Sequence, residues 1–363
     1  MENKKQKTVL LALSGGVDSS VAALLLKKQG YKVIAAFMKN FSDTKNPRTE
    51  ECNWVEEKKM AQKISALLSI PFLTFDFEKE YKALVMAPMY KAYSLGLTPN
   101  PDTTCNTIIK FPLLWKKAKL LKADYIAFGH YAKIKKDKTG FSLFAGKDKT
   151  KDQSYFLYGL SQNDLSHTLF PLSDLTKSEV REIAKKNKLP NWDKKSTSGI
   201  CFIGNINFQQ FLKTKIKPKI GKVFDSKGKL IGLNQGIQYY TIGQRIGPHI
   251  GISIKKPEGN EQQKWYIAKK LKGNKIIAVP ENHPLLKTSK IKIKNLHIIN
   301  EKIEIPKKIK ARIRHLGSLH SGKLIKSPSP IFIFSKPVES VAPGQSIVFY
   351  SKSRVIGGGQ ITL

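Results

Sequence analysis

The feature that most constrains this chain is a glycine-rich turn near its N-terminus. Residues 8–13 form a short apolar run that ends in Ser14-Gly15-Gly16, which predicts a buried strand closed by a tight turn. From Val17 onward, apolar residues recur at helical spacing, so we expect a helix to begin there. The chain is therefore predicted to run from a strand through a glycine-rich loop into a helix, as α/β folds do.

This loop has the properties of an anion site. Adjacent glycines let the backbone turn and come close to a ligand. The N–H groups of the loop and of the helix start then face an anion, with the helix dipole behind them. An ordinary turn with capping serines is the alternative. A Walker-type phosphate loop is excluded, because no Gly-Lys-Ser/Thr follows at the required spacing.

Beyond the turn, strand-like and helix-like segments alternate through the first half of the chain. Strands are predicted at residues 31–37, 71–77 and 123–128, and helices at residues 53–68, 78–95, 111–121, 162–169 and 178–187. This order predicts a parallel sheet with helices on both faces and with ligands at the carboxyl ends of the strands. The loops that follow Leu13, Phe37 and Phe128 share that edge of the sheet.

Past about residue 206 the pattern changes to short alternating strands separated by Gly, Pro and Asn, which is typical of a small barrel or sandwich. After a helix at residues 208–215, strands are predicted at residues 222–224, 238–241, 265–269, 276–279, 331–334 and 347–350. We therefore divide the chain into a catalytic domain of residues 1–206, a small central domain of residues 207–275 and a C-terminal β-barrel domain of residues 276–363.

The formal net charge of +37 favours a polyanionic partner such as a nucleic acid. Only six of the 64 basic residues are arginine, so a bias toward lysine can account for much of this charge. In residues 308–314, Lys308, Lys310, Arg312 and Arg314 alternate with three apolar residues, which predicts a strand with one cationic face. That face is either solvated or follows a phosphate backbone.

Three cysteines, Cys52, Cys105 and Cys201, provide neither a disulfide framework nor a CxxC metal pair. Two prolines stiffen the loop before Cys105, and small residues surround Cys201. Either cysteine alone is more often a buried, inert thiol. No run of about 18 apolar residues occurs, and the basic N-terminus leads straight into the first strand, so we expect a cytoplasmic protein without a membrane span or a signal peptide.

The segment Ser14-Gly15-Gly16-Val17-Asp18-Ser19-Ser20 resembles the pyrophosphate loop of the PP-loop ATPases. The resemblance implies that ATP is cleaved between its α and β phosphates, with adenylation of a substrate oxygen and release of pyrophosphate. It also implies that Asp18 helps to hold Mg²⁺ and pyrophosphate, since a carboxylate among phosphates needs a cation between them.

Further motifs narrow the resemblance to one family within this superfamily, the bacterial tRNA-specific 2-thiouridylases. The matching blocks occur in order over nearly the whole chain, at residues 98–102, 129–131, 151–157, 199–204, 241–245 and 343–346. The implied fold is an N-terminal PP-loop domain of the adenine nucleotide α-hydrolase type, a central tRNA-binding domain and a C-terminal β-barrel. The implied reaction replaces oxygen by sulfur at carbon 2 of the wobble uridine in tRNAs for Lys, Glu and Gln.

The resemblance also implies roles for individual residues. Cys201 would carry a persulfide delivered by a sulfur-relay protein or a cysteine desulfurase, Cys105 would free its terminal sulfur, and Asp102 would act as acid or base. ATP-binding is implied for Ala12, Leu13, Ser14, Gly15, Gly16, Val17, Asp18, Ser19, Met38 and Gly129. Binding of the flipped-out base is implied for Asn100, Pro101 and Asp102, and tRNA contact for His130, Lys151, Asp152, Gln153, Arg314, His315 and Gln345.

The chemistry of these residue types agrees with the implied roles. Sulfur transfer needs one thiolate that bears sulfur and a second that attacks it, both exposed. The target base must leave the anticodon stack, so the site needs a pocket with contacts on the base edge.

This sequence departs from the family at residues 196–198, where an acidic residue is missing, at the loop of residues 247–251, and at His315, where a tyrosine is expected. These departures affect expected tRNA contacts and leave the predicted catalytic positions unchanged. Three alternatives stay open at this stage: a PP-loop sulfurtransferase for another tRNA base, an amide-forming PP-loop synthetase, and a tRNA-binding protein with a degenerate ATP site.

Overall fold

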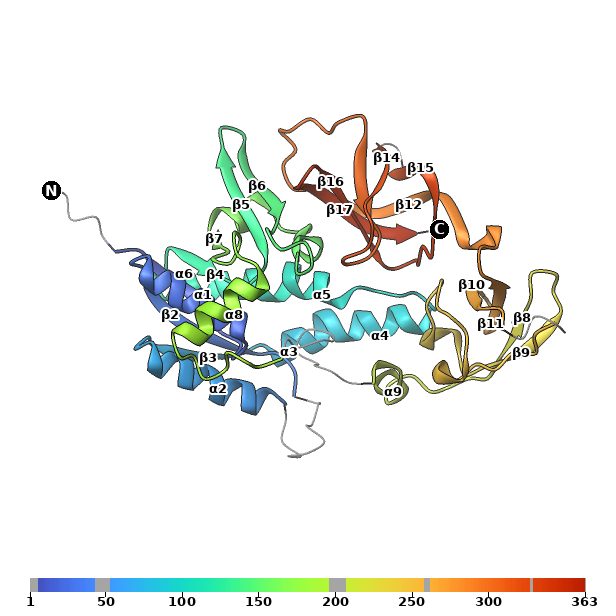
Figure 1. Cartoon of the computed structure of the whole chain (residues 1–363), viewed down its shortest axis with the longest axis horizontal. Helices are drawn as coiled ribbons and strands as arrows, with labels where there is room; N and C mark the ends of the chain where they lie inside the picture. The colour runs from blue at the N-terminus through green and yellow to red at the C-terminus, as the bar shows by residue number, and fades with distance from the viewer. Residues whose placement is uncertain (1–5, 43–52, 196–206, 258–261, 327–328, 363) are drawn as a thin grey trace.

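The computed structural model describes residues 6–42, 53–195, 207–257, 262–326 and 329–362. An α/β domain, a C-terminal β-barrel and a small β domain follow one another across the view of Figure 1. Cys52 and Cys201 lie outside the described residues.

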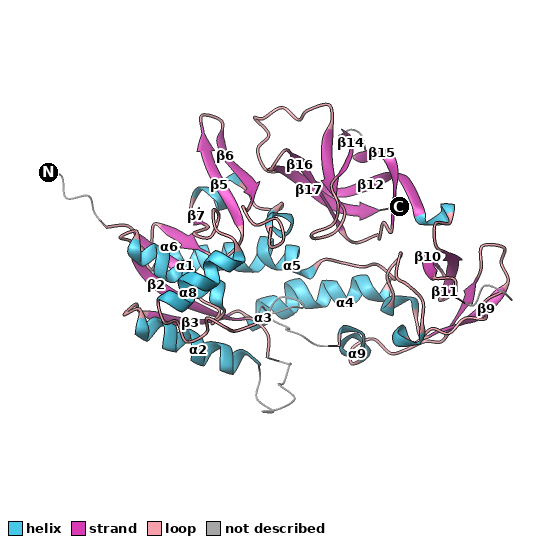
Figure 2. Cartoon of the chain, viewed as in Figure 1, coloured by secondary structure: helices cyan, strands magenta, loops and turns pink. Residues whose placement is uncertain are grey.

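The core of the first domain is a parallel sheet with the strand order β3-β2-β1-β4-β7. Its strands are β1 (Thr8–Ala12), β2 (Lys32–Lys39), β3 (Phe72–Asp76), β4 (Tyr125–Ala127) and β7 (Thr168–Leu169). Neighbouring residues of β1 enter different apolar clusters: Val9 and Leu11 pack with one set of helices, and Leu10 packs with another. Helices therefore cover both faces, which confirms the predicted parallel α/β domain (Figure 2).

One face of the sheet packs against α1 (Val17–Lys28), α2 (Asn53–Leu67) and α8 (Lys177–Lys186). The other packs against a long helical segment, α3 (Glu78–Tyr81), a π-helical turn Lys82–Met86 and α4 (Ala87–Ser94), and against α6 (Phe111–Leu120). Short helices α5 (Pro101–Thr104), α7 (Gln162–Ser166) and α9 (Phe208–Lys213) complete the set among the described residues. The predicted helices are present, except that the helix predicted at residues 162–169 ends at Ser166 and Thr168–Leu169 form strand β7. Helix α8 begins at a capping box formed by Thr176 and Glu179.

Six antiparallel strands close into a barrel at the C-terminal end of the chain. They are β12 (Lys287–Ile298), β13 (Ile309–Arg312), β14 (His320–Ile325), β15 (Ile331–Glu339), β16 (Ser346–Ser351) and β17 (Arg354–Thr362), and β12 closes the ring by pairing with both β15 and β17. The sequence analysis missed a hairpin of the first domain, β5 (Ala132–Asp137) and β6 (Gly140–Ala145), which adds to the barrel sheet through β17. The two domains therefore share one sheet.

The central domain is built on a four-stranded sheet of β8 (Gly221–Phe224), β9 (Leu230–Asn234), β10 (Trp265–Leu271) and β11 (Lys275–Pro280). Its strand β11 pairs with both β10 and β8. The boundary predicted at residue 275 would cut this strand, so the structure places the end of the domain after Pro280. The strand predicted at residues 238–241 is wrong, because Ile237–Tyr239 form a 3₁₀ turn.

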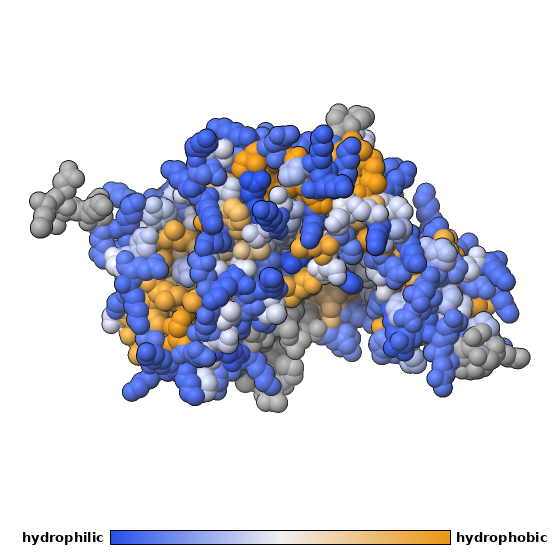
Figure 3. All heavy atoms as spheres, turned by 45° about the horizontal axis from the view of Figure 1, so that its top comes forward, coloured by the Kyte–Doolittle hydropathy of each residue, from blue (hydrophilic) through white to orange (hydrophobic). Residues whose placement is uncertain are grey.

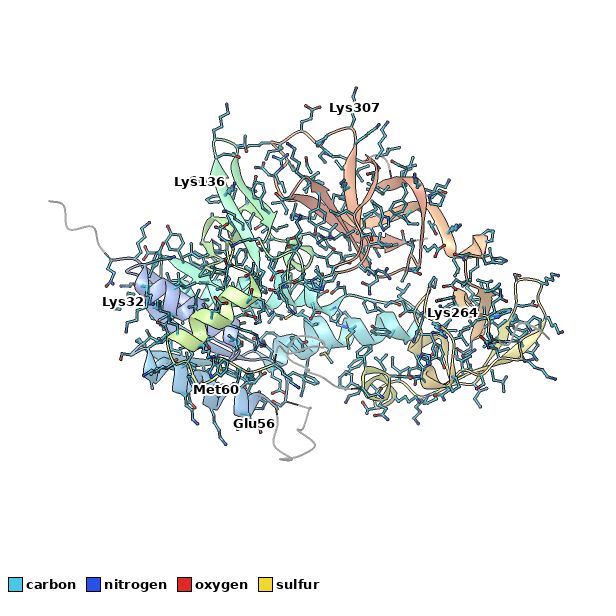
Figure 4. The ribbon with its side chains drawn as sticks, viewed as in Figure 1. Lys32, Glu56, Met60, Lys136, Lys264 and Lys307 are labelled. Carbon is cyan, nitrogen blue, oxygen red and sulfur yellow. The ribbon has the colours of Figure 1, made fainter. Side chains whose placement is uncertain are left out.

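The basic residues are distributed over the whole molecule. Figure 4 labels Lys32, Lys136, Lys264 and Lys307, which are exposed and belong to different parts of the chain from one end of the molecule to the other. The face shown in Figure 3 is largely hydrophilic, with apolar residues in separate patches. Among the described residues, no helix is long and apolar enough to cross a membrane.

Candidate active site

The predicted phosphate loop joins β1 to α1 at the carboxyl edge of the parallel sheet. Gly15 has a φ of 75°, and a side chain there would collide with the backbone of Glu57, so only glycine fits. Gly16 stands at the N-cap of α1, and no side chain caps the helix N-terminus. Its first N–H groups are therefore available to an anion, as phosphate binding requires.

Three serines fix the shape of this loop. The Ser19 hydroxyl donates to the carbonyl oxygen of Gly16 at 3.0 Å and lies 3.1 Å from the Ser14 hydroxyl. The Ser20 hydroxyl donates to the same carbonyl oxygen at 2.9 Å. The side-chain amide of Asn191, which is buried, donates to the carbonyl oxygen of Gly15 and to the Ser20 hydroxyl, both at 3.0 Å. Hydrogen bonds within the protein therefore hold the loop in this shape.

The carboxylate of Asp18 faces two side chains from other elements. It accepts a hydrogen bond from the Tyr131 hydroxyl at 2.7 Å and forms an ion pair with the Lys177 ammonium group at 2.5 Å. Burial, with the nearby Asp18 charge as a second cause, raises the pKa of Tyr131, so its hydroxyl stays protonated and donates. Lys177 therefore brings a cation to the start of α1, where phosphate charge would collect.

Gly129, predicted to bind ATP, packs directly on the loop. A Cβ atom there would lie 2.9 Å from the carbonyl carbon of Asp18 and 2.9 Å from the amide nitrogen of Ser19. Met38, also predicted to bind ATP, lies in the buried part of β2. The loops after β1 and β4 thus meet at one edge of the sheet, as the sequence predicts, and most of the loop after β2 lies outside the described residues.

We expect the Gly129→Ala variant to raise the KM for ATP at least tenfold, because the added methyl group displaces the backbone of Asp18 and Ser19. Steady-state kinetics at varied ATP concentration measure this effect. The thermal unfolding temperature and the affinity for tRNA serve as controls and should stay close to those of the unmodified protein. A KM equal to that of the unmodified protein would show that the loop tolerates the displacement.

The predicted base-binding loop leads into α5. Asn100 is the N-cap of this helix, and its side-chain oxygen accepts a hydrogen bond from the Thr103 N–H at 3.2 Å. Pro101 occupies the first helical position, where its missing N–H costs no hydrogen bond. Asp102 follows in the first turn and is half-buried. The three residues thus have fixed places at one helix start.

Cys105 begins a π-helical turn, Cys105–Lys110, directly after α5. Its side chain is 1% exposed and belongs to an apolar cluster that extends from the first domain into the central domain and the barrel. The expectation that this thiol is exposed is wrong for the conformation described here, because the turn aims the side chain into the core. The predicted partner Cys201 lies outside the described residues, so the pairing of the two cysteines stays a prediction.

The structure separates the residues predicted to contact tRNA into exposed and buried ones. Lys151 and Arg314 are exposed, and Gln153 and Gln345 are half-buried. His130 is buried beneath Phe111, Phe128 and Phe170, and burial lowers the pKa of His130, so its ring is neutral. The tRNA contacts of these five residues stay predictions.

Asp152 has a different setting from the one predicted. Its side chain is 1% exposed, and its carboxylate forms an ion pair with Arg312 of β13 at 2.7 Å. The Arg312 guanidinium also lies over the ring of Tyr350, 5.3 Å from its centroid. The alternation predicted for this strand is confirmed, but Arg312 faces Asp152 and does not join a row of solvated cations. The Nε2–H of His315 donates to the carbonyl oxygen of Asp152 at 2.9 Å, and the His315 ring packs on Phe156.

Sequence reasoning missed three residues of this site: Tyr131, Lys177 and Asn191. Each lies far along the chain from the residue it contacts, so no local spacing marks it. The block of residues 129–131 includes Tyr131, but its hydrogen bond to Asp18 becomes evident only in three dimensions.

Known protein families and individual proteins match this chain over nearly its whole length. Family models match in chain order: the tRNA methyl transferase HUP domain at residues 7–205, the tRNA methyl transferase PRC-barrel domain at residues 209–281 and the aminomethyltransferase beta-barrel domain at residues 288–361. The chain is 41% identical over 364 residues to tRNA-specific 2-thiouridylase MnmA 2 of Aliarcobacter butzleri, which covers 99% of both chains. It is 40% identical over 363 residues to tRNA-specific 2-thiouridylase MnmA 1 of Geobacillus kaustophilus, covering 98% of this chain and 96% of that protein.

Proposed function

The chain belongs to the tRNA-specific 2-thiouridylase family, and we propose that its residues divide the reaction among an ATP loop, a base-binding loop and two cysteines. The enzyme carries out the 2-thiolation of the wobble uridine of tRNA and uses ATP through its HUP domain. The assignment of roles rests on one observation. At the carboxyl edge of the sheet, the N-terminus of α1 has no side-chain cap, and Asp18 in its first turn contacts Tyr131 and Lys177.

The ATP loop activates the uracil oxygen. In this proposal the N–H groups of residues 15–19 bind the phosphates, and the uracil oxygen at carbon 2 attacks the α phosphate, so that pyrophosphate leaves. The adenylated oxygen then departs as AMP, a far better leaving group than the original oxygen. Lys177 lies beside Asp18 and can neutralise the charge that develops on the leaving pyrophosphate.

A Mg²⁺ ion bound with ATP fits the residues at this loop. Magnesium is usually held by one or two carboxylates together with substrate phosphates and water. Asp18 supplies one carboxylate, and no cluster of three or more His, Cys, Asp or Glu side chains suited to a resident metal occurs among the described residues. Asp18 would therefore hold a cation that arrives with the nucleotide and screens its phosphates.

Asn100, Pro101 and Asp102 bind the flipped-out uracil. The helix start that they form is rigid, because Asn100 caps α5 and Pro101 fixes the first helical turn. Asp102 is the general acid or general base for the reaction at the uracil. A rigid loop of this kind can bind the edge of a base that has left its stack.

The two cysteines supply the sulfur. Cys201 carries a persulfide, and the Cys105 thiolate attacks its inner sulfur, so that the terminal sulfur is released as hydrosulfide and a Cys105–Cys201 disulfide forms. The hydrosulfide displaces AMP at carbon 2 of the base. A dithiol reductant then reopens the disulfide, and a sulfur-relay protein or a cysteine desulfurase reloads Cys201. Because Cys105 is buried in the conformation described here, its segment must move during the cycle.

The tRNA substrates in this proposal are those for Lys, Glu and Gln, and the reaction takes place in the cytoplasm. The first domain contacts the barrel through the Asp152–Arg312 ion pair, the His315 ring and the Thr98–Pro343 backbone bond. The residues predicted to contact tRNA lie on or beside these segments: Lys151 and Arg314, which are exposed, and Gln153, His315 and Gln345. The net charge of +37 supports a polyanionic substrate.

Release of pyrophosphate tests this proposal without requiring a sulfur donor. We expect ATP and unmodified tRNA for Lys, Glu or Gln to give rapid release, and the same tRNA with cytidine in place of the wobble uridine to give none. A coupled phosphate assay measures the release. Release that is independent of tRNA would favour an amide-forming synthetase, and tight tRNA binding without release would indicate a degenerate ATP site.

A further inference from the structure

The start of the base-binding loop, between α4 and α5, lies where all three domains meet (Figure 1). The buried residue Thr98 donates its N–H to the carbonyl oxygen of Pro343 in the barrel at 2.9 Å, and its hydroxyl donates to the hydroxyl of Thr241 in the central domain at 3.4 Å. Gly344 of the barrel has a φ of 96°, and a Cβ atom there would lie 2.8 Å from the Thr98 nitrogen, so only glycine fits. One residue of the catalytic domain therefore contacts both other domains.

Two further glycines with a positive φ complete a ring of contacts among the domains. Gly96 of the catalytic domain has a φ of 76°, and a Cβ atom there would lie 3.0 Å from the Cδ1 atom of Ile237 in the central domain. Gly243 of the central domain has a φ of 83°, and a Cβ atom there would lie 2.2 Å from the Oγ atom and 2.8 Å from the Cα atom of Ser340 in the barrel. Each domain thus places one glycine against the next domain, so the three are in close contact around the start of the loop.

The chain carries the position of Thr98 directly to Asn100. Only Pro99 stands between them, and two residues span at most about 7 Å. A residue before a proline is restricted to extended conformations, and the proline fixes its own φ, so this link is stiff. Asn100 then caps α5 by accepting from the Thr103 N–H at 3.2 Å, and Pro101 occupies the first helical position. A shift of Thr98 therefore displaces the loop that is proposed to bind the uracil.

We propose that Thr98 is a positioning residue for adenylation, through which the central domain and the barrel together set Asn100 and Asp102 against the uracil. This inference rests on the proposed roles of Asn100 and Asp102. It gives the motif blocks at residues 241–245 and 343–346 a common part in the chemistry, since both contact Thr98. A displacement of about 1 Å in a group that positions a substrate can lower a rate about 100-fold, so a small change at Thr98 has a measurable effect.

The first test compares alanine substitutions at two glycines that have a positive φ. Gly344→Ala adds a methyl group against the Thr98 backbone. Gly273→Ala, in the turn between β10 and β11, strains a backbone with a φ of 73° in the same way, but the nearest atom would lie 3.8 Å from its Cβ atom. The measurements are single-turnover pyrophosphate release at saturating ATP and tRNA, and the Kd for each of these two ligands. Partial unfolding lowers the amplitude of a single turnover and leaves its rate constant unchanged, so the rate constant reports on the position of the loop.

We expect Gly344→Ala to lower the rate constant at least tenfold, because the displaced loop no longer holds the uracil in line with ATP. The Kd values for ATP and tRNA should change less than threefold, and Gly273→Ala should stay within twofold of the unmodified rate constant. Equal rate constants for the two glycine variants would overturn the inference.

The second test removes the hydrogen bond between the two threonine hydroxyls from either end. We expect Thr98→Val and Thr241→Val each to lower the rate constant about fourfold, and the double variant to be no slower than the slower single one, since both remove the same bond. Thr98→Ser keeps the hydroxyl and should stay within twofold of the unmodified rate constant. Losses that multiply in the double variant, or a Thr98→Ser protein as slow as Thr98→Val, would overturn the inference alone. Absence of tRNA-dependent release from the unmodified enzyme would overturn the proposed function, and this inference with it.

Discussion

Replacing Cys105 by serine should abolish the formation of 2-thiouridine while ATP and tRNA still give pyrophosphate. A serine hydroxyl is not an effective nucleophile toward sulfur, so the terminal sulfur of the Cys201 persulfide is not released. Adenylation of the base needs the loop after β1 and Asp102, which this variant leaves in place. The expected result is therefore a loss of product below detection, with a pyrophosphate burst within about threefold of normal.

The measurement follows both products in one reaction, pyrophosphate by a coupled assay and 2-thiouridine by nucleoside mass spectrometry. Cys201→Ser should give the same split, and Cys52→Ser should leave both products unchanged, because no role is assigned to Cys52. Since Cys105 is 1% exposed, Cys105→Ala is a necessary companion: it removes the thiol without burying a hydroxyl. Loss of tRNA binding or of the folded state in both Cys105 variants would make this residue structural.

The buried state of Cys105 has a consequence for the cycle. A thiol within the apolar core is a poor nucleophile, because burial disfavours the thiolate. Its segment also carries buried polar atoms without hydrogen-bond partners, the Thr103 hydroxyl and the Asn106 side-chain oxygen. A π-helical turn at Cys105–Lys110 is a feature that recurs at functional sites. Binding of tRNA that rotates this turn would expose the thiol at the moment it is needed.

The sequence predicts the strand, the glycine turn and the helix start on the ATP side of the candidate site, because their determinants are local. The apolar run, the two glycines and the start of α1 follow one another within residues 8–28, and each obeys a rule of spacing or backbone freedom. The parallel sheet follows from the alternation of strands and helices. The motif at residues 98–102 indicates a rigid loop because two prolines stand in it.

The contacts between domains could not be predicted in the same way. Asp152 and Arg312 are 160 residues apart, and Lys177 lies 159 residues from Asp18, so neither pair leaves a periodic signal in the sequence. The hairpin of β5 and β6 belongs to the first domain by its place in the chain, but it pairs with β17 and so extends the sheet of the barrel. The alternation of basic and apolar residues predicts that Arg312 lies on a cationic face of its strand. It does not reveal that Asp152 lies opposite that face.

Exchanging Asp152 for asparagine should destabilise the protein by about 3–5 kcal/mol, which is the usual cost when one partner of a buried ion pair is removed. The Asp152 carboxylate accepts hydrogen bonds from the N–H groups of Gly146 and Ser154 at 3.3 and 3.1 Å. Asparagine retains an oxygen that can accept both bonds. The loss then comes from the Arg312 guanidinium, whose side chain is 14% exposed and would keep its charge without a carboxylate. Thermal and chemical unfolding measure this effect.

The matched control is a pair at the surface. Lys133 and Asp174 form an ion pair at 2.7 Å with side chains that are 34% and 68% exposed, and Lys133→Ala should cost at most about 1 kcal/mol. Adding Arg312→Met to Asp152→Asn should restore part of the stability, since it removes the stranded charge. An Asp152→Asn protein with normal stability but weakened tRNA binding would instead favour the direct tRNA contact that the sequence motif implies. A destabilised protein that binds tRNA normally would mean that this carboxylate serves to hold the barrel against the catalytic domain.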